Sequence, residues 1–370
     1  MSTIKAINVQ HPSSATTNLV NDASGNVAVG NNLTVAGTAT VTGATTLTGN
    51  VTATGTVAMG SSFKRNRIIN GNMATDQRNA GAAQTITAGA ALAYSVDRWY
   101  AYCTGANVTG QQVAGATANQ YRYRFTGAAS VTAIGFAQRI EAINSADLAG
   151  TTATLSVDLA NSLLTTVTWT AYYANTTDTF GTLASPTVTS IATGTFTVTS
   201  TVTRYNAQIS IPSAATTGLQ IVLSVGAQTS GTWTIGSVQL EVGTKATPYE
   251  MQIYSDQLAQ CQRYYVQYNA STTTSALGVL PAICAGTTNV QATLFLPVQL
   301  RASPTLTIAG ANNNYLWLAF GFQTTTSTTI TTLANYQNVI YFNLAGFTGL
   351  SDGIPGSFSV RNTLTVSAEL

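Results

Sequence analysis

The stretch Tyr121-Arg-Tyr-Arg-Phe125 carries the alternation that decides the fold. Aromatic side chains occupy every second position, and Arg122 and Arg124 lie between them. Successive side chains of an extended strand point to opposite faces of a sheet, so the aromatics share one face and the arginines the other. The stretch therefore predicts a strand with an apolar face. The two arginines fit either a site for an acidic glycan or an ordinary solvated or ion-paired sheet face.

Comparable short strands, separated by turn signals, extend in both directions from about Phe63 to Glu250. This pattern is typical of an all-β sandwich or jelly roll. The predicted strands are Tyr121–Thr126, Ala153–Leu159, Leu164–Tyr173, Thr195–Val202, Tyr205–Ile211, Leu219–Val225 and Trp233–Val242.

The composition agrees with an all-β chain. Of the 370 residues, 7% are charged and 45% are hydrophobic, whereas a soluble domain usually carries about 25% charged residues. A chain this apolar is not disordered, and threonine, which favours the pleated surface of a sheet, replaces much of the missing charge. Because a β-rich surface with few charges invites association, we expect an oligomer.

Several function classes are not expected at this level. A net charge of +2 provides no basic surface for nucleic acid, and no apolar run reaches the roughly 18 residues of a membrane helix. The first residues lack the apolar core of a secretory signal. Cys103, Cys261 and Cys284 are too widely spaced for a disulfide framework or a zinc cluster, and His11 has no second ligand nearby. We therefore expect no metal and no cofactor.

A six-residue repeat occupies residues 33–60. Glycine recurs every six residues from Gly37, and Val35, Val41 and Leu47 each precede a glycine by two positions. A short strand followed by a turn cannot bury its own apolar face, so neighbouring chains must cover it. The constant phase of the apolar residues favours a shaft of three intertwined chains over a flexible Gly/Thr linker. These three apolar residues are therefore candidate trimer-interface residues.

Two groups of motifs in the central region resemble the tail fibres of tailed bacteriophages. The first group is RNRIINGNMATDQRN at residues 65–79, followed by SVDRW at 95–99. The second is VQLEVGTKATPYE at 238–250, followed by SDQLAQCQRYY at 255–265. The resemblance implies a trimeric fibre with a jelly-roll domain similar to carbohydrate-binding modules, and with a short connecting helix after that domain.

The charges of the opening motif have a structural interpretation. Asp76 and Arg78, and Asp97 and Arg98, stand close to apolar residues such as Trp99. In a chain so poor in charge, we interpret them as ion-paired groups at the apolar edge of the domain rather than as ligand contacts.

The connecting helix is also predicted from its residues. Ser255 suits the N-cap, and Asp256 suits the positive end of the helix dipole. Leu258, Cys261 and Tyr265 then fall on one face. Because so short a helix is marginal alone, we predict that this face is a subunit interface.

Residues 266–370 form a second β-rich unit, the predicted tip. The segment TLFLPVQLRASPTLT at 293–307 resembles a strand–Pro–Arg–Pro–strand element in the terminal domains of fibre proteins, and the last strand, at 359–370, matches that pattern in outline. The aromatic-rich segment between them suits sugars, since rings stack on C–H faces while amides and hydroxyls bond OH groups; the same aromatics also suit a core or a subunit interface. Binding residues concentrate on loops that a rigid scaffold holds in place, so loop positions are favoured here. The glycan-binding candidates are Asn312, Asn313, Asn314, Tyr315, Trp317, Gln323, Tyr336 and Asp352.

Enzymatic activity is not expected. Glycoside hydrolysis usually needs two carboxylates within about 5–10 Å, and no spacing brings Glu141, Asp147 and Asp158 together. A Ser-His-Asp site would need His11, no lysine follows Lys245 to form a Ser-Lys dyad, and no phosphate-binding or dinucleotide motif appears.

The sequence thus predicts an all-β intertwined homotrimer with five parts: an attachment segment (1–30), a hexad-repeat β shaft (31–62), a central jelly-roll sandwich (63–250), a connecting helix (251–265) and a C-terminal β-sandwich tip (266–370). The predicted function is that of a tail fibre in the virion, assembled in the host cytoplasm, which binds phage tail or baseplate proteins through its N-terminus and a host surface polysaccharide. No nucleic acid and no membrane insertion are expected. The alternative is a purely structural spacer or docking protein without glycan binding.

Overall fold

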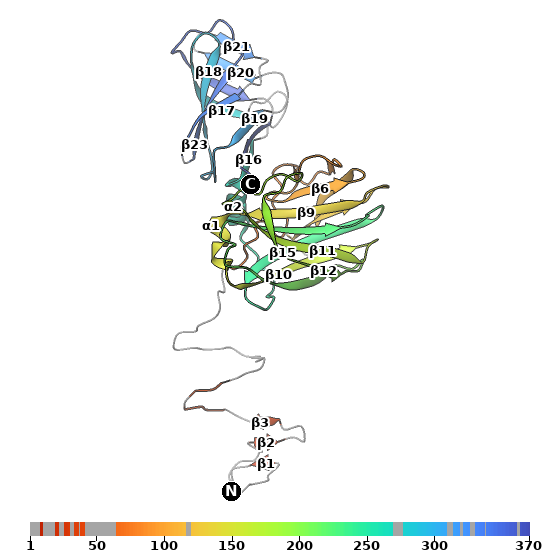
Figure 1. The fold of residues 1–370 in the computed structure, drawn as a ribbon. Helices are drawn as coiled ribbons and strands as arrows, with labels where there is room; N and C mark the ends of the chain where they lie inside the picture. Colours follow the sequence, from red (N-terminus) through yellow and green to blue (C-terminus); the bar gives the residue numbers. More distant parts are fainter. Residues whose placement is uncertain are drawn as a thin grey trace. The chain divides into compact units, whose positions relative to one another are not determined.

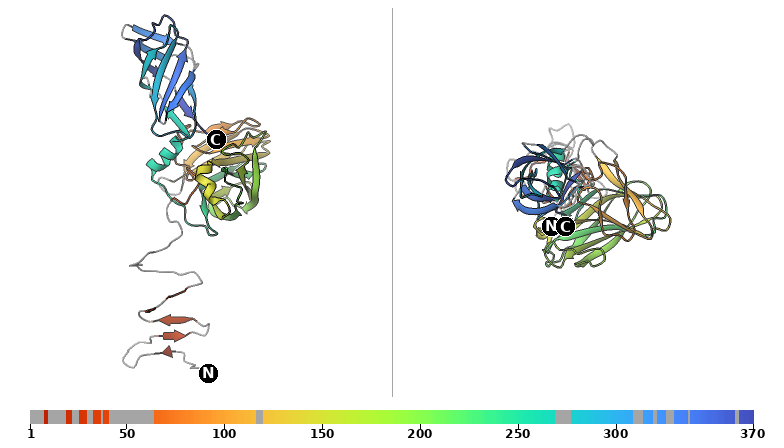
Figure 2. Two further views of the ribbon diagram at one scale, coloured as in Figure 1. Left: turned by 60° about the vertical axis from the view of Figure 1, so that its left-hand side comes forward. Right: turned by 90° about the horizontal axis from the view of Figure 1, so that it is seen from above.

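The computed structural model of the protein divides into two compact units, Met1–Gly60 and Ser61–Leu370 (Figure 1 and Figure 2). The structure describes residues 8–9, 19–21, 26–29, 33–36, 38–40, 64–115, 120–268, 277–308, 314–318, 321–325, 330–336, 338–360 and 363–370.

The first unit contains a small antiparallel sheet with the strand order β1-β2-β3. Within the predicted repeat, Leu33 and Val35 are 72% and 47% exposed in the single chain, so their apolar side chains have no cover there. Val41 and Leu47 lie outside the described residues, and the trimeric shaft stays a prediction. The strands are β1 (Asn8–Val9), β2 (Leu19–Asn21) and β3 (Val27–Val29).

The central domain is a sandwich of two antiparallel six-stranded sheets, which confirms the all-β prediction. One sheet has the order β13-β10-β15-β8-β7-β4, and the other has the order β12-β11-β14-β9-β6-β5. Apolar side chains from the two inner faces form a single core. The strands are β4 (Gln84–Ile86), β5 (Ala93–Tyr94), β6 (Tyr100–Thr104), β7 (Val108–Ala114), β8 (Tyr121–Thr126), β9 (Ala133–Ile140), β10 (Thr152–Asn161), β11 (Thr166–Ala174), β12 (Val188–Thr197), β13 (Thr203–Ser210), β14 (Leu219–Val225) and β15 (Thr232–Val242).

Stacked aromatic rings fill the centre of this core. The ring of Phe136 lies 4.7 Å from Trp99 and 5.0 Å from Tyr123, measured between ring centroids. Phe125 stacks on Trp233 at 5.3 Å. All five side chains are almost completely buried. Each such aromatic pair stabilises the fold by about 0.5–1.5 kcal/mol beyond the burial of its area. Because Tyr123 and Phe125 are buried in this core, the aromatic face predicted for β8 is the inner face of the sandwich.

Most predicted strands lie close to observed ones, but one is displaced along the chain. The prediction of a strand from Thr195 to Val202 is wrong at both ends, because β12 begins at Val188 and stops at Thr197. Beyond that point Thr199 and Thr201 hydrogen-bond to each other at 3.3 Å, which bends the chain out of the sheet.

Two short helices lie beside the sandwich, α1 (Ala142–Ser145) and α2 (Tyr254–Gln262). The prediction of Ser255 as the N-cap is wrong: the Ile253 carbonyl already accepts hydrogen bonds from the next turn, and no side chain caps the helix. Tyr265 lies in a strand after the helix rather than on its face. Among the described residues, neither helix nor any other is long and apolar enough to cross a membrane.

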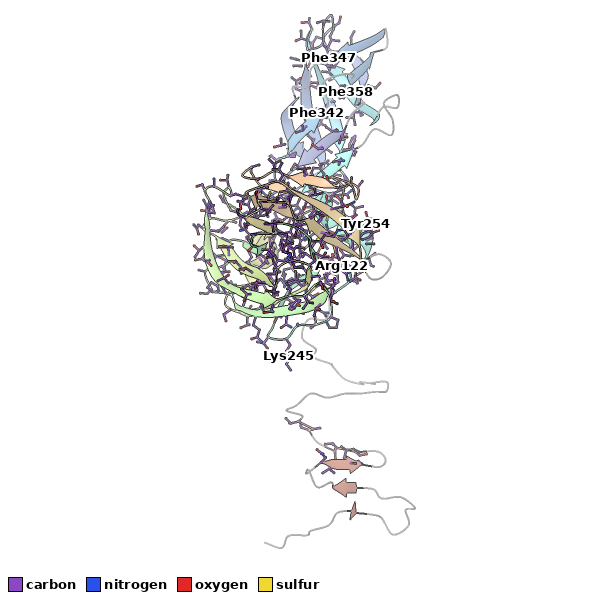
Figure 3. The ribbon with its side chains drawn as sticks, turned by 90° about the vertical axis from the view of Figure 1, so that its right-hand side faces the viewer. Arg122, Lys245, Tyr254, Phe342, Phe347 and Phe358 are labelled. Carbon is purple, nitrogen blue, oxygen red and sulfur yellow. The ribbon has the colours of Figure 1, made fainter. Side chains whose placement is uncertain are left out.

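The C-terminal domain has a seven-stranded sheet, β21-β20-β24-β17-β18-β23-β22, and a three-stranded sheet, β16-β25-β19. Phe342, Phe347 and Phe358, labelled in Figure 3, are buried in its core. The predicted Pro-Arg-Pro element joins β18 to β19. The strands are β16 (Tyr265–Tyr268), β17 (Leu277–Cys284), β18 (Asn289–Phe295), β19 (Thr305–Ile308), β20 (Asn314–Leu318), β21 (Gly321–Thr325), β22 (Ile330–Tyr336), β23 (Val339–Ala345), β24 (Pro355–Val360) and β25 (Leu364–Ser367).

A group of buried charges, which we call the junction cluster, joins the sandwich to the C-terminal domain. It consists of Arg78, Asp97, Arg98 and Glu369. Arg98 is 1% exposed and forms an ion pair with Glu369, and its guanidinium lies 3.4 Å from the ring centroid of Tyr264. Arg78 bridges Asp97 at 3.4 Å and Glu369 at 3.1 Å. The last residues of the chain are therefore fixed to the opening motif of the sandwich.

The pairing differs from the sequence interpretation in its partners. Asp97 pairs with Arg78 instead of its neighbour in sequence. Asp76 instead accepts the backbone N–H groups of Asn79 and Gly81 at 3.0 and 2.9 Å, so it shapes a turn.

Candidate functional site

The outer face of the β12–β5 sheet carries four tyrosines, Tyr94, Tyr100, Tyr102 and Tyr172, which we call the tyrosine face. They come from β5, β6 and β11. Tyr100 is almost fully buried, and the other three are half-buried. Together with Val222 they form a small apolar cluster on the side of the sheet opposite the main core.

The strand register explains how one of these rings is oriented. Tyr102 on β6 pairs with Gly135 on β9. A Cβ atom at position 135 would overlap the ring of Tyr102, so the ring lies directly against the glycine. Only a residue without a side chain leaves room for this contact. The half-buried ring is thereby held in a fixed position on the sheet, as a platform for stacking requires.

Arg139 supplies the polar part of the site. Its Nε donates to Gln220 Oε1 at 3.1 Å, its Nη2 to the Gly181 carbonyl at 2.9 Å, and its Nη1 to the backbone oxygen of Leu370 at 2.7 Å. The guanidinium also lies 5.2 Å from the ring centroid of Tyr100. One side chain thus connects the sheet, a loop and the end of the chain.

That loop, residues 175–187, joins β11 to β12 and folds back over the tyrosine face; we call it the strap. Its Phe180 is buried beside Arg139, at 5.3 Å from the guanidinium. Its Thr182 and Leu183 line two hollows, of about 190 and 540 Å³, that both include Tyr102. The smaller hollow also contains Tyr172 and Gln220, and the larger one is bordered by residues 89–91.

The phenol groups of Tyr94, Tyr100 and Tyr102 remain protonated near neutral pH. Burial raises the pKa of Tyr100 to about 12, and it raises the pKa of Tyr94 and of Tyr102 above the ordinary value of 10.0. The hydroxyl of Tyr94 donates to the backbone oxygen of Leu370 at 2.9 Å. The site therefore offers neutral rings, hydroxyl groups and the amide of Gln220, beside the guanidinium of Arg139, whose Nε, Nη1 and Nη2 atoms already donate within the chain.

The structure brings some of the predicted glycan-binding residues of the tip together and separates others, since β20 pairs directly with β21. Four strands lie between β20 and β22 in the order of the seven-stranded sheet. Asp352 lies in a turn before β24, where it is exposed and accepts the Gly286 N–H at 2.7 Å. Asn312 and Asn313 lie outside the described residues. Of the remaining candidates, β20 contains Asn314, Tyr315 and Trp317, β21 contains Gln323, and β22 ends at Tyr336.

The predicted interface residues of the helix contact their own chain. Cys261 has no exposed surface, and Tyr265 is 7% exposed with its ring centroid 3.5 Å from the guanidinium of Arg78. Leu258 is half-buried. Burial raises the pKa of the Cys261 thiol well above its ordinary value, as expected of a packed, unreactive cysteine.

The three carboxylates considered for catalysis are each paired with a different arginine. Glu141 pairs with Arg263 at 3.2 Å, Asp158 with Arg204 at 3.1 Å, and Asp147 with Arg67. Within the described parts of the chain, no group of three or more His, Cys, Asp or Glu residues could hold a metal ion.

Sequence reasoning missed the tyrosine face, although a signal was present. Tyr100 and Tyr102 alternate at strand spacing after Trp99, and Tyr172 follows a second run of alternating residues. The alternation indicates that Tyr100 and Tyr102 share a face of their strand. Only the strand order of the sheet shows that Tyr172, on β11, lies in the same sheet as these two.

Comparisons with known proteins found no matching family model and no matching curated protein. Solved structures with some likeness include an enzymatically active tailspike domain of bacteriophage CBA120 (16% identity, TM-score 0.32, 48% of this chain and 22% of that one). Another is the carbohydrate-binding module TmCBM61 in complex with β-1,4-galactotriose (12% identity, TM-score 0.29, 49% of this chain and 100% of that one). A third is a xylan-binding domain of Paenibacillus barcinonensis (15% identity, TM-score 0.28, 40% of this chain and 92% of that one). The chain thus spans less than a quarter of the tailspike chain.

Proposed function

We propose that this protein is a tail-fibre subunit of a tailed bacteriophage that binds a host surface glycan during adsorption. In this proposal three copies intertwine through residues 31–62, and residues 1–30 attach the fibre to a tail or baseplate protein of the virion. The ordered motifs at 65–99 and 238–265 support the fibre assignment. The exposed apolar residues Leu33 and Val35 support the trimer, because neighbouring chains would cover them.

The observation that carries glycan binding is the tyrosine face. A tyrosine ring held against Gly135 offers a flat apolar surface to the C–H face of a sugar, and neutral hydroxyl and amide groups nearby can bond its OH groups. Such contacts are weak singly, and three sites per fibre with several fibres per virion raise the avidity. Because neutral groups dominate, adsorption is expected to depend little on salt.

We further propose that the protein binds its glycan without cleaving it. Glu141, Asp147 and Asp158 are each engaged by a different arginine. A pair of free carboxylates flanking a bound sugar, which glycoside hydrolysis usually requires, is not formed by these residues.

The test measures binding of the full chain to an array of bacterial surface polysaccharides and to susceptible cells in competition with virions. Tyr102→Ala and Tyr172→Ala should each weaken binding about tenfold, whereas Tyr341→Ala, at a 43% exposed position in β23, should not. Sedimentation should give three times the 38.3 kDa of one chain.

The other outcomes are equally informative. Loss of binding in Trp317→Ala alone would move the site to the tip, as the sequence predicts. If a folded trimer binds neither glycans nor cells, a structural spacer or docking role becomes the better account. Point variants are preferable to truncation after residue 265, because truncation removes Glu369 and leaves buried Arg98 without its partner.

A further inference from the structure

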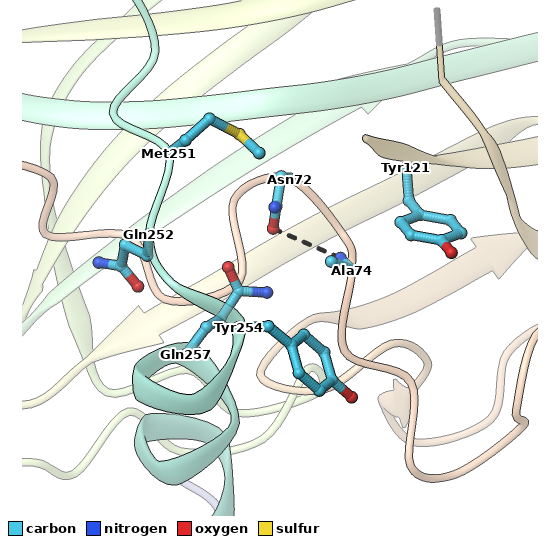
Figure 4. A pocket seen from close by; sticks show the side chains of 7 residues that line it. All are labelled: Asn72, Ala74, Tyr121, Met251, Gln252, Tyr254 and Gln257. Carbon is cyan, nitrogen blue, oxygen red and sulfur yellow. Dashed lines mark hydrogen bonds between the residues drawn. The ribbon is translucent and has the colours of Figure 1, made fainter. Parts of the chain in front are cut away.

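A second pocket, of about 480 Å³, lies beside the N-terminal end of α2 (Figure 4). We call it the junction pocket. It shares no lining residue with the tyrosine face. Its lining residues come from the opening motif of the sandwich, the start of β8, the segment just before α2 and the first turn of α2: Asn72, Ala74, Tyr121, Met251, Gln252, Tyr254 and Gln257.

The pocket offers apolar surface that a ligand can cover. Tyr254 is 58% exposed and Met251 is 54% exposed, while Tyr121 is half-buried. Figure 4 shows the rings of Tyr121 and Tyr254 both facing the hollow, with the amide of Gln257 nearby. Two tyrosine rings and a thioether in one hollow provide broad, polarizable contact area.

Two of the lining residues carry polar atoms whose hydrogen bonds are incomplete. The Oε1 atom of Gln252 is buried and has no partner in the part of the chain that the structure describes. The amide nitrogen of Gln257 donates to Asn70 and Thr75 at 2.8 and 3.2 Å, which leaves its oxygen as a further acceptor. A buried acceptor without a donor costs free energy, and a ligand hydroxyl would supply the donor.

Among the residues that the structure describes, none of those lining the pocket is charged. An anionic or cationic ligand would therefore lose its hydration without gaining an ion pair. A ligand with an apolar ring face and several hydroxyl groups suits both the tyrosine rings and the two amide oxygens.

We propose that the junction pocket is a second binding site, for a neutral sugar unit, with Tyr121 and Tyr254 as stacking surfaces and Gln252 and Gln257 as hydrogen-bond acceptors. The inference rests on the proposed function for its ligand class, because both sites would then bind neutral units of a surface glycan. Two sites on one chain would bind two units of a polymer and raise the avidity of each copy.

The experiment titrates the full chain with neutral trisaccharides of glucose, galactose, mannose and N-acetylglucosamine by calorimetry. Tyr102→Ala, which disables the tyrosine face, serves as the background in which the junction pocket is measured alone. Adding Tyr121→Ala or Tyr254→Ala should weaken the remaining binding about tenfold. Adding Tyr341→Ala should leave it unchanged, and raising the salt concentration should not alter it.

The outcomes separate the two proposals. If Tyr102→Ala alone abolishes all sugar binding, the junction site is overturned and the tyrosine-face proposal stands. If binding remains in that background but neither Tyr121→Ala nor Tyr254→Ala weakens it, the junction site is also overturned. If the unmodified chain binds neither these sugars nor surface glycans, the proposed function fails and this inference fails with it.

Discussion

At the scale of single residues, the contact between Gly135 and Tyr102 gives a sharp test of the tyrosine face. Gly135→Ala should displace the ring, because its Cβ would overlap the ring atoms. We expect a loss of about 1–3 kcal/mol in the free energy of unfolding, with about tenfold weaker glycan binding. Denaturant unfolding and array binding measure the two effects.

Gly226→Ala is the matched control, since a Cβ at that position meets no atom within 4 Å. If both variants behave alike, or if Gly135→Ala binds glycan normally, then the position of the Tyr102 ring does not matter for binding.

Asp97 makes stability depend on pH. Burial raises its pKa from 3.8 to about 7, although the charge of Arg78 acts in the opposite direction. Between about pH 4 and pH 7 the folded protein therefore binds more protons at this site than the unfolded chain, so the free energy of unfolding falls as the pH rises. Asp97→Asn should remove this component, at most about 1.4 kcal/mol per pH unit. Urea midpoints of both proteins from pH 4 to 8 measure it; a constant difference between them contradicts the prediction.

At the scale of secondary-structure elements, the alternation of apolar and polar residues correctly predicts strands that have one polar face. β8 alternates between buried and accessible residues, and the sequence predicts its bounds correctly. β9 is buried on both faces from Ile134 to Ile140, because the core covers one side and the tyrosine face the other. Its sequence shows no alternation, and the prediction omits it. β14 (Leu219–Val225) is also buried on both faces, yet its apolar run predicts its bounds correctly; in β9 the run is interrupted by Gly135, Gln138 and Arg139, so neither an apolar run nor an alternation marks it.

The connecting helix is secured at its C-terminal end by a charged hydrogen bond. The hydroxyl of Tyr264 donates to Glu141 at 2.6 Å, and Glu141 is 3% exposed. Tyr264→Phe should therefore lower the free energy of unfolding by about 1.5–3 kcal/mol. Tyr268→Phe, whose hydroxyl bonds the neutral carbonyl of Phe295 at 3.1 Å, is the control and should cost about 0.5–1.5 kcal/mol. Thermal or urea unfolding compares them, and equal losses would show that the charge of Glu141 adds nothing.

At the scale of the whole molecule, the sequence predicts a sandwich, a helix and a β-rich C-terminal region, and it places the candidate glycan-binding residues in the tip. Trp317 and Tyr336 belong to strands far apart in sheet order, which no local pattern reveals. Tyr102 and Tyr172 are 70 residues apart in sequence by their numbers, and they meet only because β14 and β9 place β11 and β6 in one sheet. A site whose residues come together only through the order of strands in a sheet cannot be predicted from the local sequence around each residue.

The contact between the sandwich and the C-terminal domain should be most sensitive to substitutions in the junction cluster. Glu369→Ala leaves Arg98 buried and unpaired, and we expect a loss of about 3–5 kcal/mol in the free energy of unfolding. Asp147→Ala breaks an ion pair whose carboxylate is 57% exposed and should cost at most about 1 kcal/mol. Chemical unfolding measures both, and similar losses in the two variants would show that the cluster does not hold the domains together.

The attachment of the final residues to the sandwich also has a mechanical consequence. The C-terminal domain is joined to the sandwich twice, through helix α2 and through the contacts of Glu369 and Leu370 with Arg98 and Arg139. A pull on the C-terminal domain is shared between these two tethers, so both must yield before the domain separates. In the proposed tail fibre, a virion dragged by flow while the C-terminal domain is held would load both tethers in parallel, and the joint would resist a force that either tether alone would not.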